Sequence, residues 1–142
     1  MTMPLRHEGL VRLLALPTLT DHRGGLTPIT FADWGFEAVR CFVVTAPAGS
    51  VRGGHAHRVC RQVLMRVSGV VDVDVRLGDS AETVRLDDST PAVLVEAGVW
   101  ARQTYVTDDA ALVVFADMPY DPDDYVDADP ADSAPPRPGG CA

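Results

Sequence analysis

Short runs of alternating apolar and polar residues dominate the chain between about residue 38 and residue 116. In the clearest run, VVDVDVR, Val71, Val73 and Val75 alternate with Asp72, Asp74 and Arg76. A period of two is that of a β-strand with one face in a core. Similar runs are AVRCFVVTA, RQVLMRVSG, ETVRLDD, AVLVEAG, RQTYVT and AALVVFAD. Turn residues separate them at intervals of about 8–12 residues, so the sequence predicts an all-β, antiparallel sandwich or barrel.

The two ends of the chain differ from this central pattern. Residues 21–31 contain a Gly24-Gly25 turn before an alternating run, which predicts an additional edge strand or two. After Asp117 the sequence becomes acidic and proline-rich, and Tyr120 and Tyr125 favour a short docked helical turn. We therefore predict a single β-barrel domain over residues 1–126 and a disordered tail over residues 127–142, which has too little apolar surface to offset its ordering entropy.

Composition restricts the function. A length of 142 residues suits one domain with a core. The net charge of −8 argues against a nucleic-acid partner, and no apolar run is long enough to cross a membrane. The twelve cations are all arginines, which excludes Schiff-base catalysis by a lysine. Three cysteines without CxxC spacing suit reduced thiols, so we expect a cytoplasmic protein.

The stretch VRGGHAHR holds two of the four histidines. On a strand, His55 and His57 project to the same face and Ala56 to the other. We expect both rings in the barrel interior; the alternative is that they are solvated loop residues. Inside a barrel the pair would serve either as metal ligands or as acid/base catalysts.

A metal site normally needs a third or fourth protein ligand. Gln62, five residues after His57, is a neutral amide and a poor ligand, and the later strand EAGVWARQTYV has no histidine. Only His22 would be left to complete a site. We therefore expect neither a metal nor another cofactor.

Acid/base chemistry explains the pair better, because an imidazole exchanges protons near neutral pH. Arg52 and Arg58 flank the histidines, and Arg102 is expected to approach from the opposing strand. Arginines stabilise anionic intermediates and bind phosphate through paired hydrogen bonds. The pattern therefore favours a reaction with an anionic intermediate or a substrate that carries a phosphate.

Five stretches, in order, resemble the sugar-nucleotide 3,4-ketoisomerases of the cupin superfamily. They are DHRGGL (residues 21–26), RGGHAHR (52–58), VSGVVDVDV (67–75), AGVWARQTYV (97–106) and FADMPYDPDDYV (115–126). The resemblance implies a jelly-roll barrel, a homodimer with exchanged N-terminal strands, and no metal. It also implies an isomerase that converts dTDP-4-keto-6-deoxyglucose to its 3-keto isomer in deoxysugar biosynthesis.

In this family's reaction a base removes the C3 proton, an enediol forms, and C4 is then protonated. The resemblance gives His57 the role of base and His55 that of shuttle or orienting partner. The implied substrate-binding residues are Arg52, Arg23, Gln62, Arg102 and Trp100.

The chain also departs from the family. Cys41 and Phe42 stand where those enzymes carry a tyrosine pair, so no phenol is expected at the site, and Ala101 replaces a histidine found in many members. These changes keep two alternatives open. One is a metal-free cupin-fold cyclase, dehydratase or double-bond isomerase acting on a carbonyl-bearing natural-product intermediate. The other is a non-catalytic barrel that binds a small ligand.

Overall fold

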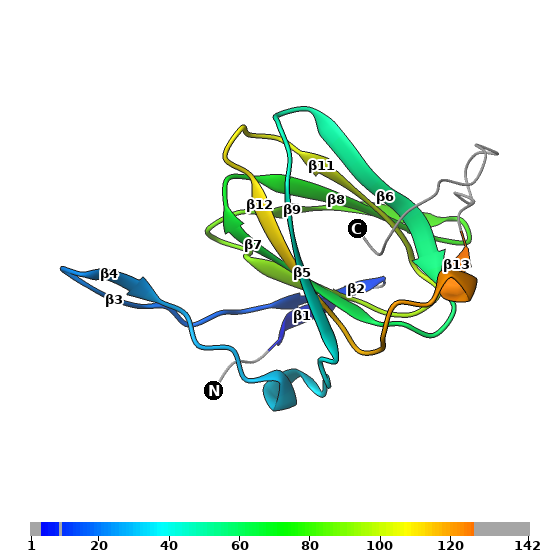
Figure 1. Cartoon of the computed structure of the whole chain (residues 1–142), viewed down its shortest axis with the longest axis horizontal. Coiled ribbons are helices and arrows are strands. Elements are labelled where there is room, and N and C mark those ends of the chain that lie inside the picture. The colour runs from blue at the N-terminus through cyan, green and yellow to red at the C-terminus, as the bar shows by residue number, and fades with distance from the viewer. Residues whose placement is uncertain (1–3, 9, 127–142) are drawn as a thin grey trace.

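Two antiparallel sheets face each other and form a barrel (Figure 1). The computed structural model describes residues 4–8 and 10–126, with only the backbone of residues 4–8. The six-stranded sheet has the order β1 (Pro4–Glu8), β2 (Val11–Leu14), β10 (Ala92–Val95), β7 (Gln62–Ser68), β12 (Ala111–Ala116), β5 (Arg40–Thr45). The five-stranded sheet has the order β13 (Tyr125–Val126), β6 (Ser50–His57), β11 (Trp100–Tyr105), β8 (Val71–Leu77), β9 (Ser80–Leu86). The predicted all-β antiparallel fold is confirmed.

The alternating run that predicted a strand forms β8. Val71, Val73 and Val75 are fully buried between the sheets. On the opposite face Asp72 forms an ion pair with Arg85 of β9, at 2.8 Å between Oδ1 and Nε. Burial of one apolar face against the other sheet is the main driving force for this arrangement.

A second apolar layer covers the outer face of the six-stranded sheet. The turn η1 (Phe31–Trp34) brings in Trp34, and Phe36 follows it. Both are buried against Val63 and Leu94. The segment between β4 and β5 therefore closes this face of the sheet.

A small hairpin, β3 (Leu19–Asp21) and β4 (Gly24–Leu26), stands away from the barrel (Figure 1). Its two strands form a separate two-stranded sheet. The expected Gly24-Gly25 turn is wrong by two residues, because the turn residues are His22 and Arg23. Gly24 instead begins β4 with a φ of 118°, a conformation that favours glycine.

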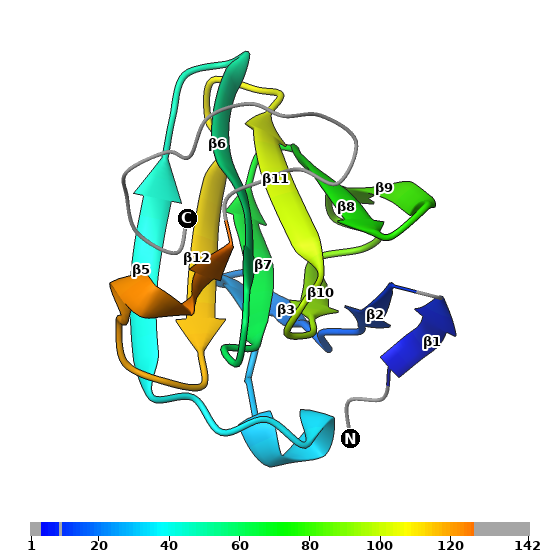
Figure 2. The same cartoon turned by 90° about the vertical axis from the view of Figure 1, so that its right-hand side faces the viewer.

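The end of the described chain returns to the barrel, as Figure 2 shows from the side. The predicted helical turn is confirmed as η2 (Pro122–Asp124), in which the Asp121 side chain accepts a hydrogen bond from the Asp123 amide. β13 follows at once and pairs with the end of β6. The predicted tail, residues 127–142, lies outside the described residues. Among the residues described, no helix has the length and apolar character needed to cross a membrane.

Candidate active site

Strand β6 carries both histidines into the barrel. His55 and His57 are each 7% exposed, and their ring centroids lie 5.2 Å apart with the rings nearly perpendicular. Before them, Gly53 and Gly54 have φ values of 79° and 86° and form an irregularity opposite Ala101 and Arg102 of β11. Such bulges redirect the following side chains. The predicted interior position of the histidine pair is confirmed.

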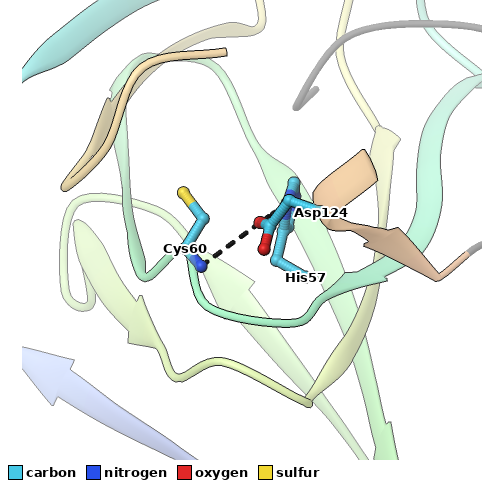
Figure 3. Close-up of side chains that lie close together, drawn as sticks. All are labelled: His57, Cys60 and Asp124. Carbon is cyan, nitrogen blue, oxygen red and sulfur yellow. Dashed lines mark hydrogen bonds and ion pairs between the residues drawn. The ribbon is translucent and has the colours of Figure 1, made fainter. Parts of the chain in front are cut away.

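Asp124 holds His57 in place (Figure 3). The Oδ2 atom of Asp124 lies 3.1 Å from Nδ1 of His57, and both side chains are buried. The same carboxyl accepts hydrogen bonds from the backbone amides of Val59, at 2.8 Å, and Cys60, at 3.2 Å. Because an ionised carboxylate only accepts hydrogen bonds, Nδ1 of His57 donates to it and carries the proton of the neutral ring. The lone pair of the ring is then on Nε2.

That Nε2 atom is buried and has no hydrogen-bond partner among the described residues. The ring borders a cavity inside the barrel, lined by His55, His57, Cys60, Gln62, Val95, Glu96, Val99, Ala101 and Gln103. A buried imidazole in the lining of a cavity, with one nitrogen fixed and the other unpartnered, has the geometry of a general base. The arrangement fits proton transfer to and from a ligand held beside His57.

A phenol ring packs on the histidine pair, contrary to the expectation that none is available. The ring of Tyr125 lies 4.7 Å from the ring of His55 and 4.7 Å from that of His57. It comes from β13 at the end of the domain, whereas the expectation considered Cys41 and Phe42 of β5. Tyr125 covers the two imidazoles on the side of β13, and its hydroxyl oxygen is buried.

The site gathers three potential metal ligands, since donor atoms of His57, Cys60 and Asp124 lie within 4.8 Å of one another. Two of these donor groups are already engaged in hydrogen bonds, because the Asp124 carboxyl binds Nδ1 of His57 and the Cys60 thiol donates to the carbonyl oxygen of Arg61 at 3.5 Å. The Asp124 carboxyl accepts three hydrogen bonds, one of them from Nδ1 of His57. Figure 3 shows the Cys60 sulfur directed away from that carboxyl. His22, the one further ligand considered from sequence, lies in the hairpin turn.

Two other predicted residues lie near the pair. Gln62 is buried at the start of β7 and lines the cavity. Arg52 is exposed on β6, three residues before His55 and opposite Gln103 of β11. Gln62 therefore belongs to the cavity lining, and Arg52 lies across the strand pair from the cavity-lining Gln103.

The structure separates the remaining three predicted residues from the histidines. Trp100 and Arg102 lie on the outer face of β11, because neighbouring residues of a strand point to opposite sides and Ala101 faces inward. Arg102 forms an ion pair with Asp74 at 3.1 Å, and its guanidinium lies 5.5 Å from the Trp100 ring. In the β3–β4 hairpin, Arg23 binds Asp21.

The amino-acid sequence is similar to those of known proteins. A family model described as "FdtA: WxcM-like, C-terminal" matches residues 10–131. The chain is 26% identical over 117 residues to a TDP-4-oxo-6-deoxy-alpha-D-glucose-3,4-oxoisomerase of Aneurinibacillus thermoaerophilus, covering 81% of this chain and 84% of that protein.

The fold is also similar to those of solved 3,4-ketoisomerases. The sugar 3,4-ketoisomerase QdtA of Thermoanaerobacterium thermosaccharolyticum, in complex with TDP, is 28% identical with a TM-score of 0.78, covering 83% of this chain and 88% of that one. A QdtA mutant has been solved with TDP-4-keto-6-deoxyglucose. The TDP-quinovose 3,4-ketoisomerase WlaRB of Campylobacter jejuni is 26% identical with a TM-score of 0.76, covering 83% and 92%.

Proposed function

The chain belongs to the FdtA family, and from this premise we propose that it is an isomerase that moves the keto group of a TDP-4-keto-6-deoxyhexose between C4 and C3. The observation that carries this proposal is the buried His57–Asp124 pair in the lining of the barrel cavity, in which the second ring nitrogen of His57 is unpartnered among the described residues. The relatives of this chain described above are named as ketoisomerases, and they include enzymes of TDP-linked sugars. The reaction would serve deoxysugar biosynthesis. No observation specifically favours the cyclase, dehydratase or double-bond isomerase alternative.

The first step is removal of the C3 proton, which is acidified by the adjacent C4 ketone. Nε2 of His57 takes this proton, and the electron pair of the C3–H bond forms a C3=C4 double bond. The C4 carbonyl oxygen accepts a proton, giving a neutral enediol. Asp124 stabilises the imidazolium that His57 becomes, because Nδ1 already donates to its carboxylate at 3.1 Å.

The second step returns a proton to C4. The hydroxyl on C3 loses its proton to His55 and becomes the new carbonyl, and the protonated Nε2 of His57 delivers a proton to C4, so the product is an isomer of the substrate. His55 lies beside His57 in the same cavity and serves as the second group for proton transfer between the two oxygens. Burial of both rings keeps bulk water from the enediol.

Binding of the nucleotide needs cations near the cavity. Arg52 is exposed on the strand that carries the histidines and forms no hydrogen bond or ion pair with another described residue that would occupy its guanidinium. We assign it to the diphosphate, since guanidinium and phosphate form paired, charge-assisted hydrogen bonds.

Conversion of TDP-4-keto-6-deoxyglucose in deuterated water tests the function. We expect the 3-keto isomer to form and deuterium to enter at C3 of the substrate pool and C4 of the product, because the histidines exchange their protons with solvent between turnovers. NMR spectroscopy and mass spectrometry measure both. A reaction without protein is the control. Folded protein that gives neither product nor deuterium incorporation contradicts the proposal.

We also propose that the protein is a homodimer in which the β3–β4 hairpin packs on a second copy. The hairpin pairs with no other strand of its own chain among those described. Leu19 and Leu26, which are cross-strand partners, are 66% and 60% exposed. Exposed apolar pairs of this kind gain free energy when a partner covers them. The same packing would bring Arg23 close to the nucleotide bound by the partner subunit.

We also propose a cytoplasmic location, because Cys41 and Cys60 form no disulfide in the structure and a reducing compartment suits such thiols.

Charging this apolar pair should dissociate the dimer. We expect Leu19→Glu with Leu26→Glu to shift the protein from dimer to monomer in analytical ultracentrifugation, because burial of two carboxylates at an interface is costly. Leu77→Glu is the matched control, since Leu77 is also exposed (50%) but ends β8. A wild-type monomer, or a double variant that stays dimeric, would refute the hairpin interface.

A further inference from the structure

The side chain of Gln103 lies in the active-site cavity and has no part in the mechanism described above. It projects inward from β11, is 4% exposed, and lines the same cavity as His55 and His57. Its Oε1 atom is buried and has no hydrogen-bond partner among the described residues. A buried amide oxygen without a partner costs free energy, so such atoms in native proteins call for a functional explanation.

The second unpartnered polar atom of this cavity is Nε2 of His57. Around these atoms the lining includes the apolar residues Val95, Val99 and Ala101, which offer no hydrogen bonds. Both atoms belong to side chains that line one cavity, so a single molecule bound there can supply a hydrogen bond to each. Because His57 acts on the reacting carbon, Gln103 would contact atoms close to that carbon.

The backbone opposite Gln103 is shaped to leave room for its carboxamide. A Cβ atom at Gly53 would lie 2.8 Å from Oε1 and 3.1 Å from Nε2 of Gln103, closer than normal contact. Gly53 also has a φ of 79°. Because Gly53 has no Cβ atom, the carboxamide of Gln103 can lie against strand β6 in the cavity lining.

We propose that Gln103 is a substrate-binding residue that holds the α-hydroxyketone edge of the sugar; this inference rests on the proposed function. A carboxamide offers one acceptor and two donors on a single planar group. During isomerisation one sugar oxygen changes from carbonyl to hydroxyl and its neighbour changes from hydroxyl to carbonyl. Gln103 accepts from the hydroxyl and donates to the carbonyl of the substrate, and a 180° rotation of its carboxamide restores both hydrogen bonds in the product. It takes no proton and forms no covalent bond.

Gln103→Met tests this role, because methionine has a similar length and keeps the cavity filled without an amide. We expect KM to rise by about tenfold to a hundredfold with little change in kcat, since the lost hydrogen bonds hold substrate and transition state equally. The melting temperature should stay the same or rise, because an unsatisfied buried atom is removed. A purely structural residue would show the opposite result, with a lower melting temperature and an unchanged KM.

Thr104→Val is the matched control. Thr104 follows Gln103 on β11 and points to the other side of the sheet. The KM of the Thr104→Val variant should therefore equal that of the wild type. An active wild type with an unchanged KM in Gln103→Met overturns this inference and leaves the proposed function intact. A folded wild type that does not convert TDP-4-keto-6-deoxyglucose overturns the proposed function, and this inference with it.

Discussion

Replacing His57 by asparagine should lower kcat by about 10²–10⁴-fold, the range typical for loss of a general acid or base. Nε2 is the buried nitrogen of the cavity-lining His57 that has no partner among the described residues, and an asparagine amide has no basic atom to replace it. The asparagine amide can still donate a hydrogen bond to Asp124, so the fold should persist. Formation of the 3-keto sugar, followed by NMR spectroscopy, measures the effect.

Thermal unfolding shows whether this variant keeps its fold, and Arg85→Gln is the control for loss of a polar side chain. Arg85 lies on β9, where its ion pair with Asp72 is on the outer face, so turnover by this control should be normal. Activity of His57→Asn near that of the wild type would show that His57 is not the base. His55 would then become the candidate base of the cavity.

Asp124→Asn should lower kcat by about 100-fold or more although both histidines remain in place. The Asp124 carboxyl now fixes the proton of His57 on Nδ1. An asparagine Nδ2 donates to that nitrogen and moves the ring proton to Nε2, where the base must be free. Nitrogen-15 NMR of the imidazole detects this change of tautomer directly, which a loss of packing alone would not produce.

The same substitution should reduce the free energy of unfolding by about 1–3 kcal/mol, because fewer acceptor atoms remain for the backbone amides of Val59 and Cys60. Asp123→Asn is the matched control. Asp123 is the adjacent residue in η2, is exposed, and donates a hydrogen bond to the Asp121 side chain through its backbone amide, which the substitution leaves in place. A variant at Asp124 that keeps wild-type kcat and the Nδ1 tautomer would remove Asp124 from the mechanism.

Much of the fold follows from local pattern. The alternating pattern correctly predicts strand β8 and its buried face, which consists of Val71, Val73 and Val75. The spacing of the HAH triplet correctly predicts that both histidines point into the barrel. The motif resemblance to the 3,4-ketoisomerases is confirmed by the family match over residues 10–131. These predictions succeeded because strand periodicity and the order of short motifs are properties of neighbouring residues.

The composition of the site was harder to predict, because strands far apart in sequence form it. The resemblance assigns Trp100 and Arg102 to the substrate, and in the structure the residues of β11 that line the cavity are Ala101 and Gln103. A motif shows which residues are neighbours in sequence and does not show which of them faces the cavity. The face that each residue of β11 presents depends on its register with β6 and β8.

The sequence by itself determined the all-β class, the inward histidine pair and the family. These depend on the spacing of neighbouring residues and on the order of motifs, both of which can be recognised without the structure. Only the tertiary structure decided what surrounds His57. Asp124 lies 67 residues away in sequence, and it reaches Nδ1 because η2 and β13 return to the end of β6. A contact between segments so far apart is set by strand pairing and barrel closure, and no local pattern records it.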